Sequence, residues 1–275
     1  MSTIAPTLTR ARFSGAPSWS WRLADLPSPV LALLLPIVLL FLWQLALYMG
    51  WASPHILPPP QKVLQRLWLL ASSGDLVYHL QTSLTRVAWG FLFGLLIGIP
   101  LGILMGLSRT AEAYLLPSFK ALSLIPPLGW IPLLILLVGI EETLKIVVIT
   151  KAVVTPVTLS TLKGIRIIPR NYFEVARVNQ LSPWQTFRKL ILPATVPSLF
   201  TGVRYGLSNA WMALVAVELL AASEGIGYLL VWGRQLFQLD LVMACIIVIG
   251  SLGLLFDGLF ARIETRLLAW RRTAY

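Results

Sequence analysis

Two ionisable residues, Arg204 and Glu218, stand out because they lie inside a long apolar stretch at residues 194–220. An ionised side chain at membrane depth is costly, so it usually faces a cavity or an oppositely charged partner. The two residues are 14 positions apart, roughly 21 Å along a helix, and cannot pair with each other. Arg204 either meets an anion in a passage or forms a structural ion pair or reaches the interface, whereas Glu218 either lines the passage or makes a helix-packing or gating contact.

Polar, aromatic and helix-breaking residues mark further candidates for lining a passage. Those in the apolar stretch suit either a pore or hydrogen bonds between helices. The proline-rich ones predict either a broken helix, which is frequent at transport sites, or a plain kink. These further candidates are Ser208, Asn209, Trp211, Pro126, Pro127 and Trp130.

Residues suited to enzyme chemistry or to metal binding are scarce. The single cysteine, Cys245, lies in an apolar run, and His55 and His79 lack the spacing of metal ligands. The sequence also has no glycine-rich phosphate loop ending in Gly-Lys-Ser/Thr. We therefore predict no catalytic residue, no metal site and no cofactor in this chain, which argues against a membrane-embedded enzyme.

Composition indicates what must position these residues. Hydrophobic residues make up 57% of the chain and charged residues 12%, whereas soluble domains average about 25% charged. Several apolar runs reach the roughly 20 residues that cross a bilayer. We predict an all-α integral membrane protein with six spans, at Pro29–Met49, Leu80–Leu107, Ala113–Val138, Thr143–Leu162, Ala194–Leu220 and Leu239–Ile263.

The distribution of the 22 Lys and Arg residues predicts that both termini are cytoplasmic. The net charge of +11 then reports basic cytoplasmic loops, and we expect no nucleic acid partner. The predicted cytoplasmic set is Arg10, Arg12, Arg22, Arg109, Lys163, Arg166, Arg170, Arg177, Arg188, Lys189, Arg262, Arg266, Arg271 and Arg272. Outside loops hold Lys62, Arg66 and Arg234, and the residues in or at the ends of spans are Arg86, Lys120, Lys145, Lys151 and Arg204. The predicted organisation is a cytoplasmic segment, a six-span domain and a cytoplasmic tail, at 1–28, 29–263 and 264–275.

Two predicted outside segments have features of their own. Residues 58–73 form an amphipathic pattern in which Trp68 lies on the apolar face, and Lys62 and Arg66 lie off it. Trp with basic residues is typical of a helix lying at the membrane interface, although an ordinary connection fits equally. The glycine-containing loop at 221–240 re-enters the membrane, caps a cavity or simply connects two spans.

Glycines repeat every fourth residue in the predicted second span, at Gly94, Gly98, Gly102 and Gly106. Such a row of small residues lets two helices approach closely. The pattern predicts helix packing and says nothing of a substrate.

A polar segment at 168–192 joins the predicted fourth and fifth spans on the cytoplasmic side and has the signals of two short helices. Asn171 and Glu174 have capping-box spacing for the first helix. Ser182 caps the second, which is expected to stop before Pro193. The pair either lies flat on the inner leaflet or forms a knob that fits a groove on a soluble partner.

The string EVARVNQLSPWQTFRKLILP, which starts at Glu174, resembles the EAA loop of binding-protein-dependent ABC importer permeases, roughly E-A-A-x3-G-x9-I-x-L-P. Small Ala176 would let another surface approach closely. Gln180 replaces the glycine of the turn, so either Gln180 is strained at positive φ or the turn shifts to Asn179. The residues that the resemblance assigns to ATPase coupling are Glu174, Val175, Ala176, Gln180, Trp184, Leu190, Leu192 and Pro193.

The resemblance extends from HILPPPQKVL to the C-terminus and is strongest to the sulfonate, taurine and nitrate branch. It implies a homodimeric permease of the bacterial inner membrane, two cytoplasmic ABC ATPase subunits that bind ATP and Mg, and a periplasmic or lipid-anchored binding protein. We expect a small anion as substrate, an aliphatic sulfonate first, with taurine, nitrate or bicarbonate as alternatives. The competing function is a self-contained secondary carrier or channel.

Overall fold

The computed structural model describes residues 28–267, with side chains from residue 34 onward. This part of the chain is helical and contains no strand, which confirms the all-α prediction. The chain divides into two compact units, Met1–Ser53 and Pro54–Tyr275. The predicted N-terminal segment at 1–28 and the end of the tail lie almost entirely outside the described residues, together with Arg10, Arg12, Arg22, Arg271 and Arg272.

The first unit contains α1 (Ser28–Tyr48), which matches the predicted first span within a residue at each end. It is apolar over Leu34–Tyr48, and the large hydrophobic side chains there are mostly exposed. A helix with this surface is suited to lipid, because exposed apolar side chains are costly in water.

Three helices of the second unit are long and apolar enough to cross a membrane: α3 (Asp75–Leu107), α6 (Glu142–Arg166) and α11 (Leu239–Leu267). Two bent helix pairs raise the number of candidate spans to as many as five among the described residues. The predicted total of six therefore depends on how α1 and the bent pairs meet the membrane.

The first bent pair replaces the predicted third span at Ala113–Val138. α4 (Arg109–Leu124) ends before a 3-10 turn, η2 (Pro127–Trp130), and α5 (Ile131–Val138) continues from that turn. The two halves meet at 92°. Consecutive prolines remove two backbone donors and push the residue before them out of the helical region, so the helix breaks rather than kinks.

The second bent pair begins in the polar segment. α8 (Pro183–Thr186) runs through a π-helical turn, η3 (Phe187–Ile191), directly into α9 (Leu192–Ala221). The predicted stop before Pro193 is therefore wrong. In the wider π turn the N–H of Leu192 donates to the carbonyl of Phe187, and Pro193 falls in the first turn of α9, where its missing N–H is tolerated.

The predicted glycine-containing loop at 221–240 contains a further helix, α10 (Ile226–Gln235), which is bent by 42° from α9. The predicted amphipathic helix at 58–73 is α2 (Pro60–Ser73). Its Val63 is buried, whereas Trp68 is 75% exposed. This helix contacts α11, and Arg66 on it forms an ion pair with Asp240 of α11 at 2.8 Å.

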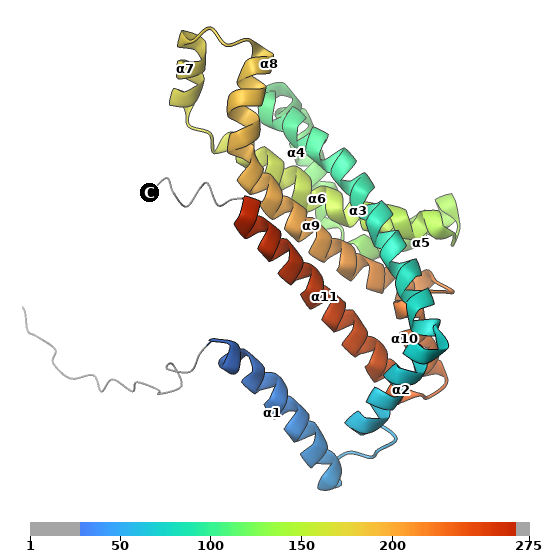
Figure 1. Ribbon diagram of the computed structural model, residues 1–275. Coiled ribbons are helices and arrows are strands. Elements are labelled where there is room, and N and C mark those ends of the chain that lie inside the picture. Colours follow the sequence, from blue (N-terminus) through green and yellow to red (C-terminus); the bar gives the residue numbers. More distant parts are fainter. Residues whose placement is uncertain (1–27, 268–275) are drawn as a thin grey trace, which may run out of the picture. The chain divides into compact units, whose positions relative to one another are not determined.

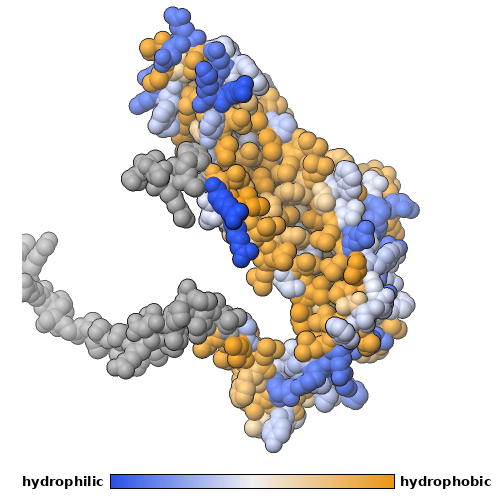
Figure 2. Space-filling model, in the orientation of Figure 1, coloured by the Kyte–Doolittle hydropathy of each residue, from blue (hydrophilic) through white to orange (hydrophobic). Residues whose placement is uncertain are grey.

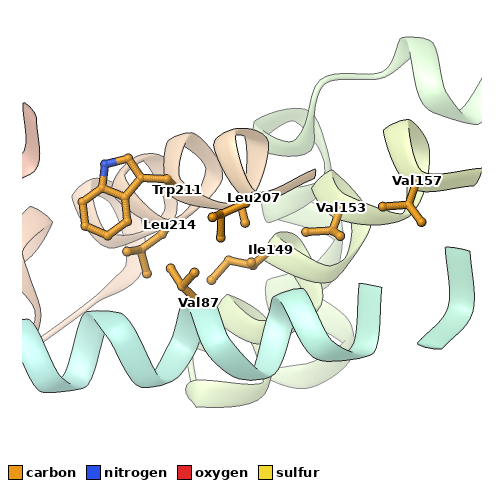
Figure 3. Close-up of a cluster of buried hydrophobic side chains, with 8 residues drawn as sticks. Val87, Ile149, Val153, Val157, Leu207, Trp211 and Leu214 are labelled. Carbon is orange, nitrogen blue, oxygen red and sulfur yellow. The ribbon is translucent and has the colours of Figure 1, made fainter. Parts of the chain in front are cut away.

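The core of the second unit lies between α3, α6 and α9, which run side by side (Figure 1). Val87, Ile149 and Leu207, one from each helix, point toward one another in Figure 3. The predicted glycine row on α3 faces α6: a Cβ at Gly102 would lie 2.7 Å from the carbonyl oxygen of Thr158. Close packing of these two helices is thereby confirmed.

Polar residues gather at the two ends of this unit. Figure 2 shows hydrophilic residues over α7 (Arg170–Val178) and α8 at one end and near α2 at the other, with hydrophobic residues dominating between them. A surface of this kind matches a bilayer flanked by water.

Candidate functional site

The hairpin of α7 and α8 extends beyond the ends of α3, α6 and α9 (Figure 1). α7 begins at Arg170, directly after Pro169, and has no side-chain cap, so the predicted capping box of Asn171 and Glu174 is not formed. Asn171 lies already inside the helix, because the N-cap is Pro169, in an extended conformation two residues before the predicted cap.

The capping box of the second helix is confirmed. Ser182 Oγ accepts from the N–H of Gln185 at 3.3 Å, and Gln185 Oε1 accepts from the N–H of Ser182 at 3.0 Å. Both contacts satisfy backbone donors that the first helical turn leaves free.

The turn between the helices is built around Gln180, which has φ = 52°. Its N–H donates to the carbonyl of Arg177 at 2.9 Å, and the N–H of Leu181 donates to the carbonyl of Ala176 at 3.0 Å. These two bonds form a Schellman motif, whose left-handed residue is usually glycine. Asn179 keeps φ = −81°, so the turn has not shifted and Gln180 carries the left-handed conformation.

The hairpin has an inner and an outer side. Ala176 is 5% exposed and lines a cavity of about 360 Å³ together with Phe187 and Ile191 of the same chain. The close approach predicted for Ala176 is therefore made by the chain itself. The outer side presents Val175, which is 58% exposed, and Val178, which is 83% exposed.

The remaining residues of the EAA-like string link the hairpin to α9. Trp184 is exposed and stacks on Phe187, with ring centroids 5.8 Å apart. Leu190 is half-buried in the π turn, and Leu192 and Pro193 are exposed at the start of α9. Since no break separates α8, η3 and α9, a displacement of the hairpin would be transmitted directly to α9.

The break between α4 and α5 borders a cavity of about 300 Å³. It brings together three predicted pore residues, Pro126, Pro127 and Asn209, with Lys151 and Thr155 of α6. Trp130, a fourth predicted pore residue, lines a neighbouring cavity of about 340 Å³ that shares Lys151 and Thr155. The sequence pattern did not single out Lys151 as a pore residue.

Arg204 has the helix-pairing role that the sequence left open. Its Nε and Nη2 donate to Asp257 Oδ1 at 2.9 and 2.8 Å, and its Nη1 donates to Glu264 at 3.0 Å, both on α11. Ser208 and Trp211 line a small cavity beside it, of about 170 Å³. With two carboxylates in contact, the charge of Arg204 is already neutralised within the described residues.

Family comparison adds to this geometry. Residues 98–269 match the family described as "Binding-protein-dependent transport system inner membrane component". The chain belongs to this family.

Curated relatives cover most of the permease. SsuC of Bacillus subtilis (strain 168), named for aliphatic sulfonates transport, is 40% identical over 88% of this chain and 87% of its own. TauC of Escherichia coli (strain K12), named as a taurine transport system permease, is 35% identical over 92% and 93%. NrtB of Synechocystis sp., named as a nitrate import permease, is 35% identical over 83% and 85%. By name these relatives are transport permeases, not enzymes.

A solved structure shares the fold. An inward-facing form of the MetNI methionine ABC transporter aligns with a TM-score of 0.58 at 22% identity, covering 74% of this permease and 97% of that chain. This permease thus shares its fold with a chain of that ABC transporter.

At the end of the permease opposite the hairpin, Glu218 lies in a buried ion network. Its side chain accepts from Arg86 Nη1 at 2.7 Å, from Ser83 Oγ at 2.8 Å and from the N–H of Gly227 at 2.9 Å. The side chains of Arg86 and Glu218 are 3% and 0% exposed. The contacts of Glu218 therefore join α9 to α3 and α10.

The network extends to α6 and to the loop before α10. Arg86 makes a two-pronged contact with Glu142 at 2.6 and 2.7 Å and also donates to the carbonyl of Glu224. Lys145 donates to Glu142 at 2.7 Å, and the N–H of Gly225 donates to His79 at 3.0 Å. This cluster was not predicted from the sequence. The signal that could have indicated it is the presence of several ionisable residues near the predicted outer ends of three apolar runs.

Metal binding finds no support in the part of the chain that is described, where no three His, Cys, Asp or Glu side chains are grouped to hold an ion.

Proposed function

We propose that this permease is the transmembrane subunit of an ATP-driven ABC importer and forms, as a homodimer, the path for a small anion. An aliphatic sulfonate is the first candidate, because the 40% identity to SsuC spans 88% of the chain. Taurine and nitrate follow from TauC and NrtB, and bicarbonate is a further small anion of the same class. The length of the similarity to SsuC carries the proposal.

The hairpin end lies in the cytoplasm in this proposal, with both chain termini on the same side of the bacterial inner membrane. The concentration of Lys and Arg in and around 163–189 supports this orientation. The network of Arg86 and Glu218 then lies toward the periplasm. There α2, with exposed Trp68, rests at the lipid interface, and a periplasmic or lipid-anchored binding protein delivers the substrate.

The hairpin is the coupling element in this proposal. Each copy docks on one of two cytoplasmic ATPase subunits, which bind ATP and Mg, while this chain binds neither. The exposed Val175, Val178 and Trp184 supply apolar anchors, and Glu174 and Arg177 beside them supply a charged rim. A compact hairpin with a Schellman turn and a capping box on α8, continuous with α9, is better suited to transmit force than a helix pair lying on lipid.

The test of the transport function uses the permease copurified with its ATPase and reconstituted in vesicles with its binding protein. We expect ATP-dependent uptake of an aliphatic sulfonate, taurine, nitrate or bicarbonate, and ATPase stimulation by the loaded binding protein. A permease that moves the anion with no ATPase bound would instead support a secondary carrier or channel. Stimulation only by a cation or a peptide would overturn the anion assignment.

The test of the coupling role is Val178→Arg. Because the side chain of Val178 is 83% exposed, the variant should fold but release the ATPase. Phe237→Arg is the matched control: Phe237 is 88% exposed in the connection between α10 and α11, away from the hairpin, and its variant should keep the ATPase bound. An ATPase that stays bound and fully coupled to Val178→Arg would assign the hairpin to the lipid surface.

A further inference from the structure

Lys151 differs from three other basic residues within the membrane helices. Arg86 contacts Glu142 and Glu218, Lys145 contacts Glu142, and Arg204 contacts Asp257 and Glu264, all at 3.0 Å or less. No carboxylate lies within ion-pair distance of Lys151 among the described residues. An ionised group at membrane depth needs a compensating charge or water. An ammonium without a carboxylate partner therefore indicates a ligand that binds reversibly.

Lys151 lies well inside α6, where its charge requires compensation. It lies nine residues after Glu142, the first residue of α6, which is about 13 Å along a helix of about 37 Å. Its half-buried side chain donates to the carbonyl of Ile125, which the break after α4 leaves without a helical donor, and lies 5.6 Å from the ring centroid of Trp130. An ammonium has three donors, so the carbonyl leaves two for another acceptor.

The cavity beside Lys151 has the size and lining of a site for a small ligand. The cavity of about 300 Å³ at the α4–α5 break is mostly apolar, with Lys151, Thr155 and Asn209 among its polar members. Asn209 is exposed on α9, although an exposed amide is unfavourable against lipid. Hydrophobic walls with a few convergent donors are typical of sites for small organic ligands.

We propose that Lys151, together with Thr155 and Asn209, forms an anion-binding site on the translocation path. Its ligand is a small oxyanion such as the sulfonate group of an alkanesulfonate, whose oxygens accept from the ammonium, the hydroxyl and the amide. The apolar walls accommodate a short alkyl group. This inference rests on the proposed transport function and adds the residue that selects for negative charge.

The experiment measures ATP-driven uptake of an alkanesulfonate by the full complex in vesicles, with Lys151 changed to Met, Gln or Arg. We expect Met and Gln to lower the uptake rate about tenfold or more, since each removes a charge-assisted contact, and Arg to retain most of it. Lys120→Met is the matched control: Lys120 is exposed on α4 and lines neither cavity, so its variant should match the wild type.

The Gln variant separates recognition from support of the helix break. Gln can still donate to the carbonyl of Ile125 but carries no charge, so recovery of uptake by Gln would show that Lys151 only stabilises the break. Asn209→Leu leaves Lys151 and its contacts unchanged and should lower uptake several-fold, which guards against a Met variant that fails to fold. Wild-type uptake with an unaffected Met variant overturns the site alone. A wild type that transports neither an aliphatic sulfonate nor taurine, nitrate or bicarbonate overturns the transport function as well.

Discussion

Arg86 Nη1 and Glu218 Oε1 lie 2.7 Å apart, although 132 residues separate them in the chain. This ion pair joins α3 to α9. Glu142 of α6 and the carbonyl of Glu224, in the loop before α10, accept from the same guanidinium. Three helices are therefore held together through one side chain at the end of the permease opposite the hairpin.

Removal of that side chain should be costly. Arg86→Met leaves the carboxylate of Glu218 buried without its counter-charge, and breaking such a pair typically lowers the free energy of unfolding by about 3–5 kcal/mol. Thermal unfolding of the purified permease in detergent measures the change. Arg66→Met removes the half-exposed pair with Asp240 and should cost at most about 1 kcal/mol. Equal stabilities for the two variants would contradict a structural role for the buried network.

Gly225 should tolerate no side chain. It has φ = 109°, a conformation almost confined to glycine, and an added Cβ would lie 2.5 Å from Glu218 Cδ. We expect Gly225→Ala to lower the free energy of unfolding by about 3 kcal/mol, from strain and crowding together. Gly74→Ala meets nothing within 4 Å and should cost only the backbone strain, about 1 kcal/mol. A calorimetric comparison that ranks Gly74→Ala as the worse variant would exclude crowding at Glu218.

Periodicity and composition predicted the features that depend on local physics. The long apolar helices, the box at Ser182 and the glycine row of α3 each follow from neighbours close in sequence. A break at Pro126 was one of two predicted outcomes, but its 92° angle was not predictable, because the angle depends on packing against α6.

Contacts between residues far apart in the chain account for the features that the sequence did not predict. Arg86 and Lys151 occur in similar apolar surroundings, and the sequence does not indicate that Arg86 meets Glu218 whereas Lys151 meets a backbone carbonyl. Likewise, Ala176 suggested an outward contact face, but the chain folds back on that face itself. Which side of a helix is covered depends on segments far along the chain.

The left-handed Gln180 predicts a stabilising substitution. At φ = 52° a side chain costs about 1–2 kcal/mol relative to glycine, so Gln180→Gly should stabilise the hairpin by about 1 kcal/mol. Amide hydrogen exchange of residues 170–186 is the measurement, and slower exchange is expected. Asn179→Gly is the control: at φ = −81° glycine gains nothing, and the variant also loses the bond from the Asn179 amide to the carbonyl of Val175. Faster amide hydrogen exchange in the Gln180→Gly variant would show that the backbone at residue 180 is not strained.

The contact between α3 and α6 predicts opposite outcomes for two glycine substitutions. A methyl group at Gly102 would meet the carbonyl oxygen of Thr158 at 2.7 Å, and a backbone atom cannot swing aside as a side chain can. We expect Gly102→Ala to lower the free energy of unfolding by about 2 kcal/mol, even after the better helix propensity of alanine. Gly250→Ala on α11 meets nothing within 4 Å, so only the propensity gain of about 0.5–1 kcal/mol remains. Unfolding temperatures of the two variants should therefore move in opposite directions from the wild type, and a rise for both would mean that α3 and α6 can separate at Gly102 without loss.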